Sequence, residues 1–181
     1  KNTSLLHLCR PQFEGGVLLK ACVNGSSELM TNLSMSLVNI LYNYQLLRFA
    51  GEDGVAAYGV IMYVNLIFLG VFIGYSIGSA PIVGYNYGAK NDTELKNIFK
   101  KSFVILTVMG ILLTAISVAF ARPLAGIFIG YDKTLLALTE HGLRLFSLAF
   151  LVCGYNIYGS AFFTALNNGI ISAAISFMRT L

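Results

Sequence analysis

Glu28 begins a row of polar side chains that continues with Asn32, Ser36, Asn39 and Asn43. On a helix of about 3.6 residues per turn, these five positions fall within an arc of about 80° and form one polar stripe. The rest of this stretch is largely Leu, Met, Val and Ile. The stripe must face other helices or water, because lipid would leave its polar groups without hydrogen bonds.

Two kinds of chemistry fit this stripe. Its amides and hydroxyls either hold helices together through hydrogen bonds or line a polar cavity. An ionisable group within a membrane span is costly, which makes Glu28 a candidate for binding a cation or a proton. The alternative for Glu28 is an interfacial carboxylate that is stabilised by the positive end of a helix beginning near Ser26. Spacing alone leaves both alternatives open.

A second polar row lies towards the C-terminal end. Asn156, Ser160, Thr164 and Asn167 recur at intervals of three or four residues, with Tyr155 beside them. Two polar-striped helices in one small bundle favour a shared polar interior over isolated helix contacts.

A row of glycines lies between these two polar rows. Gly70, Gly74 and Gly78 form a GxxxGxxxG pattern, which lets another helix approach closely. We expect these three glycines to form a helix-packing groove.

Catalytic and metal-binding patterns are missing from the sequence. Cys9, Cys22 and Cys153 are odd in number and lack metal-ligand spacing, and His7 and His141 stand alone. There is no P-loop, HExxH or GxSxG motif. We therefore expect a protein that is not an enzyme and has no metal site or organic cofactor.

Composition indicates a membrane protein. Hydrophobic residues make up 56% of the 181 residues and charged residues only 11%, against about 25% charged residues in soluble domains. Uncharged runs cover 29–47, 54–89, 102–121 and 145–178, each near or above the roughly 20 residues that span a membrane. Basic residues lie at the ends of these runs, which favours contact with anionic lipid over nucleic acid.

These runs predict an all-α membrane protein, a polytopic bundle of transmembrane helices. The four expected spans are about 24–48, 55–83, 99–121 and 145–166. We expect a cytoplasmic segment over 1–23, a tight "GEDG" loop at 51–54, an interfacial loop and helix over 122–144, and the start of a further helix over 167–181.

The distribution of Lys and Arg predicts the orientation. Seven of these residues lie before the first span or in the 84–101 loop, and four lie on the opposite side. The positive-inside rule places the N-terminus and the 84–101 loop in the cytoplasm of a multi-pass plasma-membrane protein.

Five segments resemble the C-terminal half of the multidrug and toxic compound extrusion (MATE) family. They are "NGSSELMTNLSMSLVN" (24–39), "GVAAYGVIMYV" (54–64), "SIGSAPIVGYNYGAKN" (76–91), "RPLAGIFIGYDKTLLALTEHGLRLF" (122–146) and "GSAFFTALNNG" (159–169). The resemblance implies half of a twelve-helix transporter with two six-helix lobes around a cavity that opens alternately to either side. The four spans resemble helices seven to ten, and 170–181 resembles the start of helix eleven. The N-terminal lobe would be a partner from the same protein.

The resemblance also implies roles for individual residues. Some members carry a carboxylate on helix seven that couples transport to a cation, and Glu28 matches its position. Those members have an aspartate on helix ten where this chain has Tyr155, so the acidic pair is incomplete and Na⁺ and H⁺ both remain possible coupling ions. The cavity-lining candidates are Asn32, Ser36, Asn39, Asn43, Tyr155, Asn156, Ser160 and Thr164.

The implied function is a secondary active multidrug exporter that exchanges lipophilic, cationic small molecules for Na⁺ or H⁺. One alternative is a lipid-linked oligosaccharide flippase of the same superfamily, which should have a more basic cavity. Another is a non-transporting membrane scaffold or channel subunit, in which the glycine groove and the amide stripes would be assembly contacts.

Overall fold

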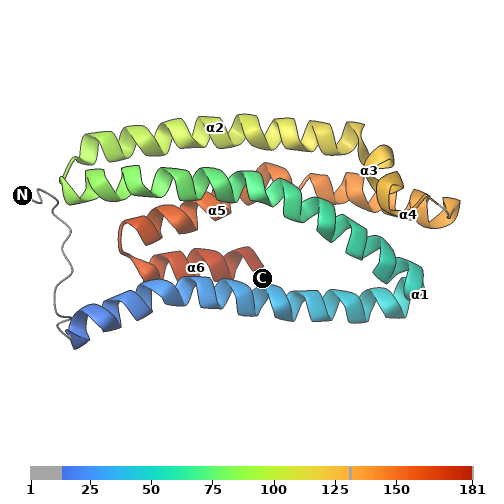
Figure 1. The fold of residues 1–181 in the computed structure, drawn as a ribbon, viewed down its shortest axis with the longest axis horizontal. Helices are drawn as coiled ribbons and strands as arrows, with labels where there is room; N and C mark the ends of the chain where they lie inside the picture. Colours follow the sequence, from blue (N-terminus) through green and yellow to red (C-terminus); the bar gives the residue numbers. More distant parts are fainter. Residues whose placement is uncertain (1–13, 131, 181) are drawn as a thin grey trace, which may run out of the picture.

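The computed structural model describes residues 14–130 and 132–180, without the side chains at 24, 27, 28, 31, 179 and 180. The described residues form helices and no strand, which confirms the predicted all-α class (Figure 1). The helices are α1 (Gly15–Gly88), α2 (Asp92–Ala119), α3 (Ala121–Phe128), α4 (Lys133–Ser147), α5 (Phe150–Ala165) and α6 (Gly169–Thr180).

A kink at Gly51 divides α1 into two arms, which fold back on each other (Figure 1). Gly51 has φ 65° and ψ −155°, a left-handed conformation that glycine adopts without a steric cost from a Cβ atom. The apolar part of α1, Asn32–Gly88, has 57 residues and would be about 85 Å long if straight, against about 30 Å of hydrocarbon in a bilayer. The helix is therefore long enough for two crossings, and the kink at Gly51 lets the chain turn back between them.

The helices extend beyond several expected boundaries. The first arm begins at Gly15 rather than near residue 24, and α2 begins at Asp92 rather than near 99. The side chain of Asn91 accepts a hydrogen bond from the backbone N–H of Glu94 at 3.2 Å and so caps α2. The hydrophilic 84–101 loop is thus mostly helical, with a short turn around Lys90.

The expected loop at 51–54 is also mostly helical. Only Gly51 leaves the helical conformation, and Glu52 and Asp53 lie in the first turn of the second arm. Acidic side chains are favourable there because the N-terminal end of a helix carries partial positive charge. The elbow is therefore a single-residue kink.

The 122–144 segment contains α3 and α4. The carboxylate of Asp132 caps α4 by accepting hydrogen bonds from the N–H groups of Thr134 and Leu135, at 2.7 and 3.2 Å. The end of α4 is followed by α5 after a bend of 51°. Besides Asn32–Gly88, α2 is long and apolar enough to cross a membrane, and the bent pair α4 and α5 is a further candidate.

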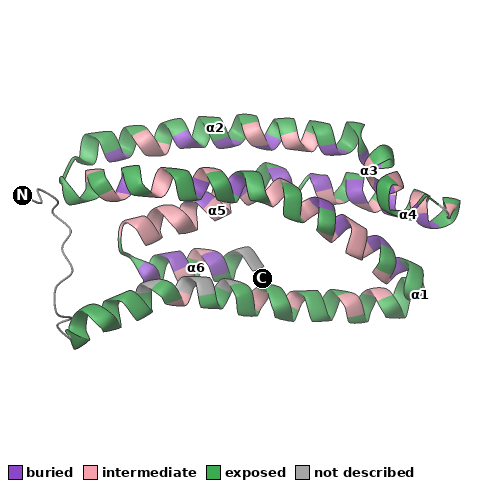
Figure 2. Cartoon of the chain, in the orientation of Figure 1, coloured by how far each residue is buried: buried purple, intermediate pink, exposed green. Residues whose placement is uncertain are grey.

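The main core lies between the second arm of α1, α2 and α5. Its fully buried side chains are Phe72, Leu106, Phe150 and Tyr158. Figure 2 shows that the buried residues of α2 follow one side of the helix, that half-buried residues accompany them, and that much of the remaining surface is exposed. One face of α2 therefore packs within the chain.

Close helix packing occurs at glycines outside the predicted groove. A Cβ atom at Gly110 would lie 3.1 Å from the Phe150 carbonyl oxygen, and one at Gly154 would lie 2.6 Å from the Phe72 ring. The predicted row of Gly70, Gly74 and Gly78 is instead exposed, and a Cβ atom at any of the three would meet no atom within 4 Å. The row lies on the face of α1 opposite buried Phe72, so it packs against none of the described residues.

Candidate transport surface

The polar row of the first arm is located on an open face of α1. Asn32, Ser36 and Asn39 are exposed and Asn43 is half-buried. Ser36 Oγ donates to the Asn32 carbonyl oxygen at 2.9 Å, and Asn43 Nδ2 donates to the Asn39 carbonyl oxygen at 2.8 Å. These bonds run within one helix, so Ser36 and Asn43 do not use them to hold a neighbouring helix.

Glu28 has a helical backbone within α1, but its side chain lies outside the described residues. Its assignment as a cation-coupling group stays a prediction. The members of the row that the structure describes with their side chains are Asn32, Ser36, Asn39 and Asn43.

The second row packs against α6. Ser160 Oγ lies 2.8 Å from both Ser172 Oγ and Ser176 Oγ, and Thr164 Oγ1 lies 2.7 Å from Ser172 Oγ. We call these four residues the serine cluster. Ser172 and Ser176 are 0% and 1% exposed. Within the described residues, Ser160 and Thr164 therefore form interhelical hydrogen bonds, and their role as cavity-lining residues stays a prediction.

Ser172 and Ser176 are hydrogen-bonding neighbours of the second polar row that the sequence analysis did not identify. They lie in the 167–181 segment, which was expected only to start another helix. Their spacing of four residues, which matches that of Ser160 and Thr164, is the sequence signal that could have found them.

Tyr155 lies on another side of α5, where it contacts α2. Its hydroxyl oxygen is 2.6 Å from Thr107 Oγ1, and its ring lies 5.0 Å from the Phe103 ring, centroid to centroid. Thr107 Oγ1 donates its proton to the Phe103 carbonyl oxygen at 2.7 Å. Tyr155 is therefore the donor to Thr107, and a hydroxyl group bonded to α2 occupies the position where the resemblance implies an aspartate.

The two polar rows have different surroundings: the first lies on an open face of α1, and the second packs against α6. In Figure 1, α6 lies between the first arm of α1 and α5, and it contacts both helices. Within the described part of the chain, the rows thus do not form the single shared interior that we predicted. Asn156 is half-buried on α5, and Asn167 is exposed in the turn before α6, with φ 58°.

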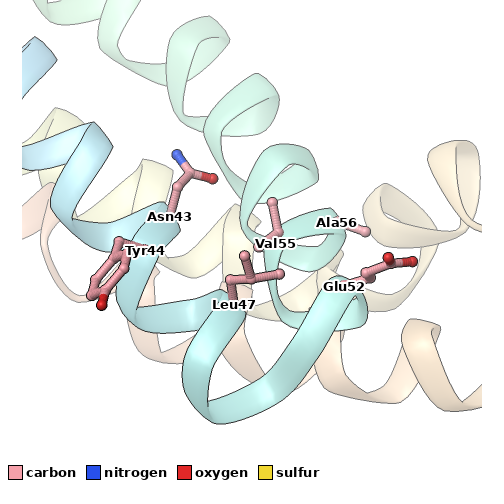
Figure 3. Close-up of a pocket in the computed structure, with 6 residues that line it drawn as sticks. All are labelled: Asn43, Tyr44, Leu47, Glu52, Val55 and Ala56. Carbon is pink, nitrogen blue, oxygen red and sulfur yellow. The ribbon is translucent and has the colours of Figure 1, made fainter.

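A groove of about 460 Å³ lies at the elbow of α1. Asn43, the last residue of the predicted row, lines it together with residues from both arms (Figure 3). The full lining is Asn43, Tyr44, Leu47, Glu52, Val55 and Ala56. The polar row therefore ends beside a largely apolar groove that contains one carboxylate.

Comparisons with known proteins agree with the predicted family and with the all-α membrane fold. A family model described as MatE matches residues 29–181. The chain is 27% identical, over 92 residues, to "Probable multidrug resistance protein YoeA" of Bacillus subtilis (strain 168), and this match covers 51% of the chain and 20% of the relative. The solved "Crystal structure of MATE in complex with MaL6" matches with a TM-score of 0.87 at 20% identity, over 94% of this chain and 38% of that chain. This last likeness concerns the fold, and the chain spans well under half of the length of either relative.

Proposed function

We propose, because the chain belongs to the MatE family, that it forms the C-terminal lobe of a multidrug exporter. The lobe would act with an N-terminal lobe of the same protein and exchange lipophilic, cationic molecules for Na⁺ or H⁺. The name of the Bacillus subtilis relative, a probable multidrug resistance protein, supports this substrate class.

The observation that carries the proposal is the open polar row on the first arm of α1. Its amides and hydroxyls lie on an apolar helix, yet Asn39 is exposed and Ser36 bonds within its own helix. Exposing such a row to hydrocarbon would cost several kcal/mol, because lipid offers amides no hydrogen bonds. Water in a cavity between two lobes would supply hydrogen bonds to the exposed polar groups of this row.

Glu28 would be the coupling residue of this lobe. One carboxylate binds either one proton or one Na⁺ ion, and this changes the charge at the start of the polar row. Such binding drives transport only if the ion has different affinities for the inward- and outward-open states. The hydroxyl at Tyr155, bonded to Thr107, supplies no second carboxylate, so we propose that this lobe couples through Glu28 alone.

The arrangement of basic residues supports the proposed orientation in the plasma membrane. The chain is a membrane protein by its family and its long apolar helices. The start of α1 and the turn between α1 and α2 lie at the same end of the molecule (Figure 1). This end carries five exposed lysines that suit anionic lipid head groups: Lys20, Lys90, Lys96, Lys100 and Lys101. We propose that this end is cytoplasmic and that the elbow lies outside.

Cysteine labelling tests whether the row lines a cavity. Ser36→Cys and Asn39→Cys are compared with Leu37→Cys, which is 60% exposed on the opposite face, in the complete transporter without its native cysteines. A water-soluble maleimide needs a hydrated thiolate, so we expect the two row positions to react about tenfold faster than Leu37→Cys. Tetraphenylphosphonium, a lipophilic cation, should protect them.

Equal labelling rates at all three positions would contradict the proposed cavity. Labelling of the row without protection by tetraphenylphosphonium would support the cavity and contradict the proposed substrate class.

A further inference from the structure

We propose that the elbow groove of α1 is a second binding site for lipophilic cations, separate from the polar row near Glu28. The class of ligand rests on the proposed function. The site itself rests on the shape, lining and charge of the groove.

The groove combines an aromatic ring, an apolar floor and a carboxylate. Figure 3 shows the ring of Tyr44 at one end and the carboxylate of Glu52 at the other, with Leu47 and Val55 between them. An aromatic face and a negative charge both attract a cation, while aliphatic side chains contact the hydrophobic part of the ligand. The groove volume of about 460 Å³ falls within the range of small-molecule sites, which is about 300–1,000 Å³.

The carboxylate of Glu52 is not neutralised by an ion pair within the described part of the chain. The ion pair found there joins Arg144 to Glu140, with Nη2 and Oε1 2.6 Å apart. The nearest basic residue in sequence, Arg48, has its guanidinium carbon 6.0 Å from the centre of the Phe49 ring. A cationic ligand in the groove would therefore meet an uncompensated negative charge.

Contacts between the two arms preform the groove. The rings of Tyr42 and Tyr58 stack across the elbow, with centroids 5.7 Å apart and planes 6° from parallel. At the elbow itself the chain is closely packed, because a Cβ atom at Gly54 would lie 2.5 Å from that of Ala50. A preformed site binds its ligand without first ordering the chain, which favours affinity.

The proposed orientation places this groove on the outer side of the membrane. A cation that leaves the central cavity could occupy it before it enters solution. Because the groove is open and Glu52 is exposed, we expect weak binding that depends on charge.

A local fluorescence reporter can test the inference, because the chain contains no tryptophan. Tyr44→Trp keeps an aromatic ring at the end of the groove, and the complete transporter with Tyr44 intact supplies the background signal. Tetraphenylphosphonium should quench Trp fluorescence saturably, and the uncharged triphenylphosphine oxide should bind more weakly. In this background Glu52→Gln should raise the apparent Kd for the cation about fivefold, as expected for loss of one exposed charge pair.

Asp53→Asn is the matched control, since Asp53 is an adjacent, exposed carboxylate that does not line the groove. It should leave the Kd unchanged. The inference is overturned if quenching is absent, if Glu52→Gln and Asp53→Asn have the same effect, or if the neutral compound binds equally well. A measurement of export by the same protein distinguishes the two proposals. Export without binding at the elbow contradicts only this inference. Charge-dependent binding without export contradicts only the proposed exporter.

Discussion

Ser172→Ala should destabilise the protein by about 1 kcal/mol. Ser172 Oγ donates to the Ser160 carbonyl oxygen at 2.8 Å and also lies 2.8 Å from Ser160 Oγ and 2.7 Å from Thr164 Oγ1. Interhelical side-chain hydrogen bonds in membranes contribute about 0.6 kcal/mol each, so the loss of three would cost up to about 2 kcal/mol.

The predicted cost is smaller because neither partner is left without a hydrogen bond. Ser160 Oγ keeps Ser176 Oγ at 2.8 Å, and the Thr164 hydroxyl, whose single proton can point to Ser172 Oγ or to the Ser160 carbonyl oxygen, donates to that carbonyl at 3.0 Å once Ser172 is replaced. An unsatisfied buried hydroxyl would add about 1–3 kcal/mol, and this penalty does not arise here.

The assay is equilibrium unfolding in mixed micelles, in which increasing SDS unfolds the purified transporter and circular dichroism follows its helices. Ser76→Ala is the matched control, because Ser76 is 3% exposed and its hydroxyl donates only to Phe72 of its own helix, at 2.8 Å. Such a bond adds little helix stability, so the control should change the free energy of unfolding by less than about 0.5 kcal/mol. Equal effects of the two substitutions would refute the assigned role of the serine cluster.

Two further predictions use the same unfolding assay. Gly154→Ala should destabilise the protein by about 1–3 kcal/mol, because its Cβ would lie 2.6 Å from the buried Phe72 ring. Gly74→Ala, in open space, should be neutral or slightly stabilising, and the reverse order of stability would contradict the packing described for α5. Thr107→Val should lower the free energy of unfolding by about 1 kcal/mol more than Tyr155→Phe, because it removes the acceptor of the Tyr155 hydroxyl. In Tyr155→Phe the Thr107 hydroxyl keeps its bond to the Phe103 carbonyl. Equal losses would mean that Tyr155 has another acceptor.

Apolar run lengths predicted the all-α class, since residues in hydrocarbon must satisfy their backbone hydrogen bonds within helices. The boundaries were less predictable. Capping by Asn91 starts α2 before its apolar stretch, and a single left-handed residue, Gly51, replaces the expected acidic loop. These features depend on local hydrogen bonds and backbone angles that hydropathy does not record.

The spacing of the polar residues could not predict which neighbour each polar row would contact. Periodicity places Ser36 and Ser160 each on a stripe, but only packing shows that Ser160 bonds to α6 while Ser36 bonds within α1. The glycines illustrate the same limit. The GxxxG motif suggested Gly74, whereas the isolated Gly110 and Gly154 make the close approaches, because their positions opposite α5 and Phe72 are set by tertiary packing.

The most direct test of cation-coupled export is tetraphenylphosphonium transport in proteoliposomes that contain the complete transporter, under an imposed Na⁺ gradient, an imposed H⁺ gradient or neither. We predict that one of the two gradients drives export. Glu28→Gln should abolish this dependence, and Glu14→Gln, at an exposed carboxylate just before α1, should retain it. Gradient-driven export that persists in Glu28→Gln would contradict the assignment of Glu28 as the coupling residue.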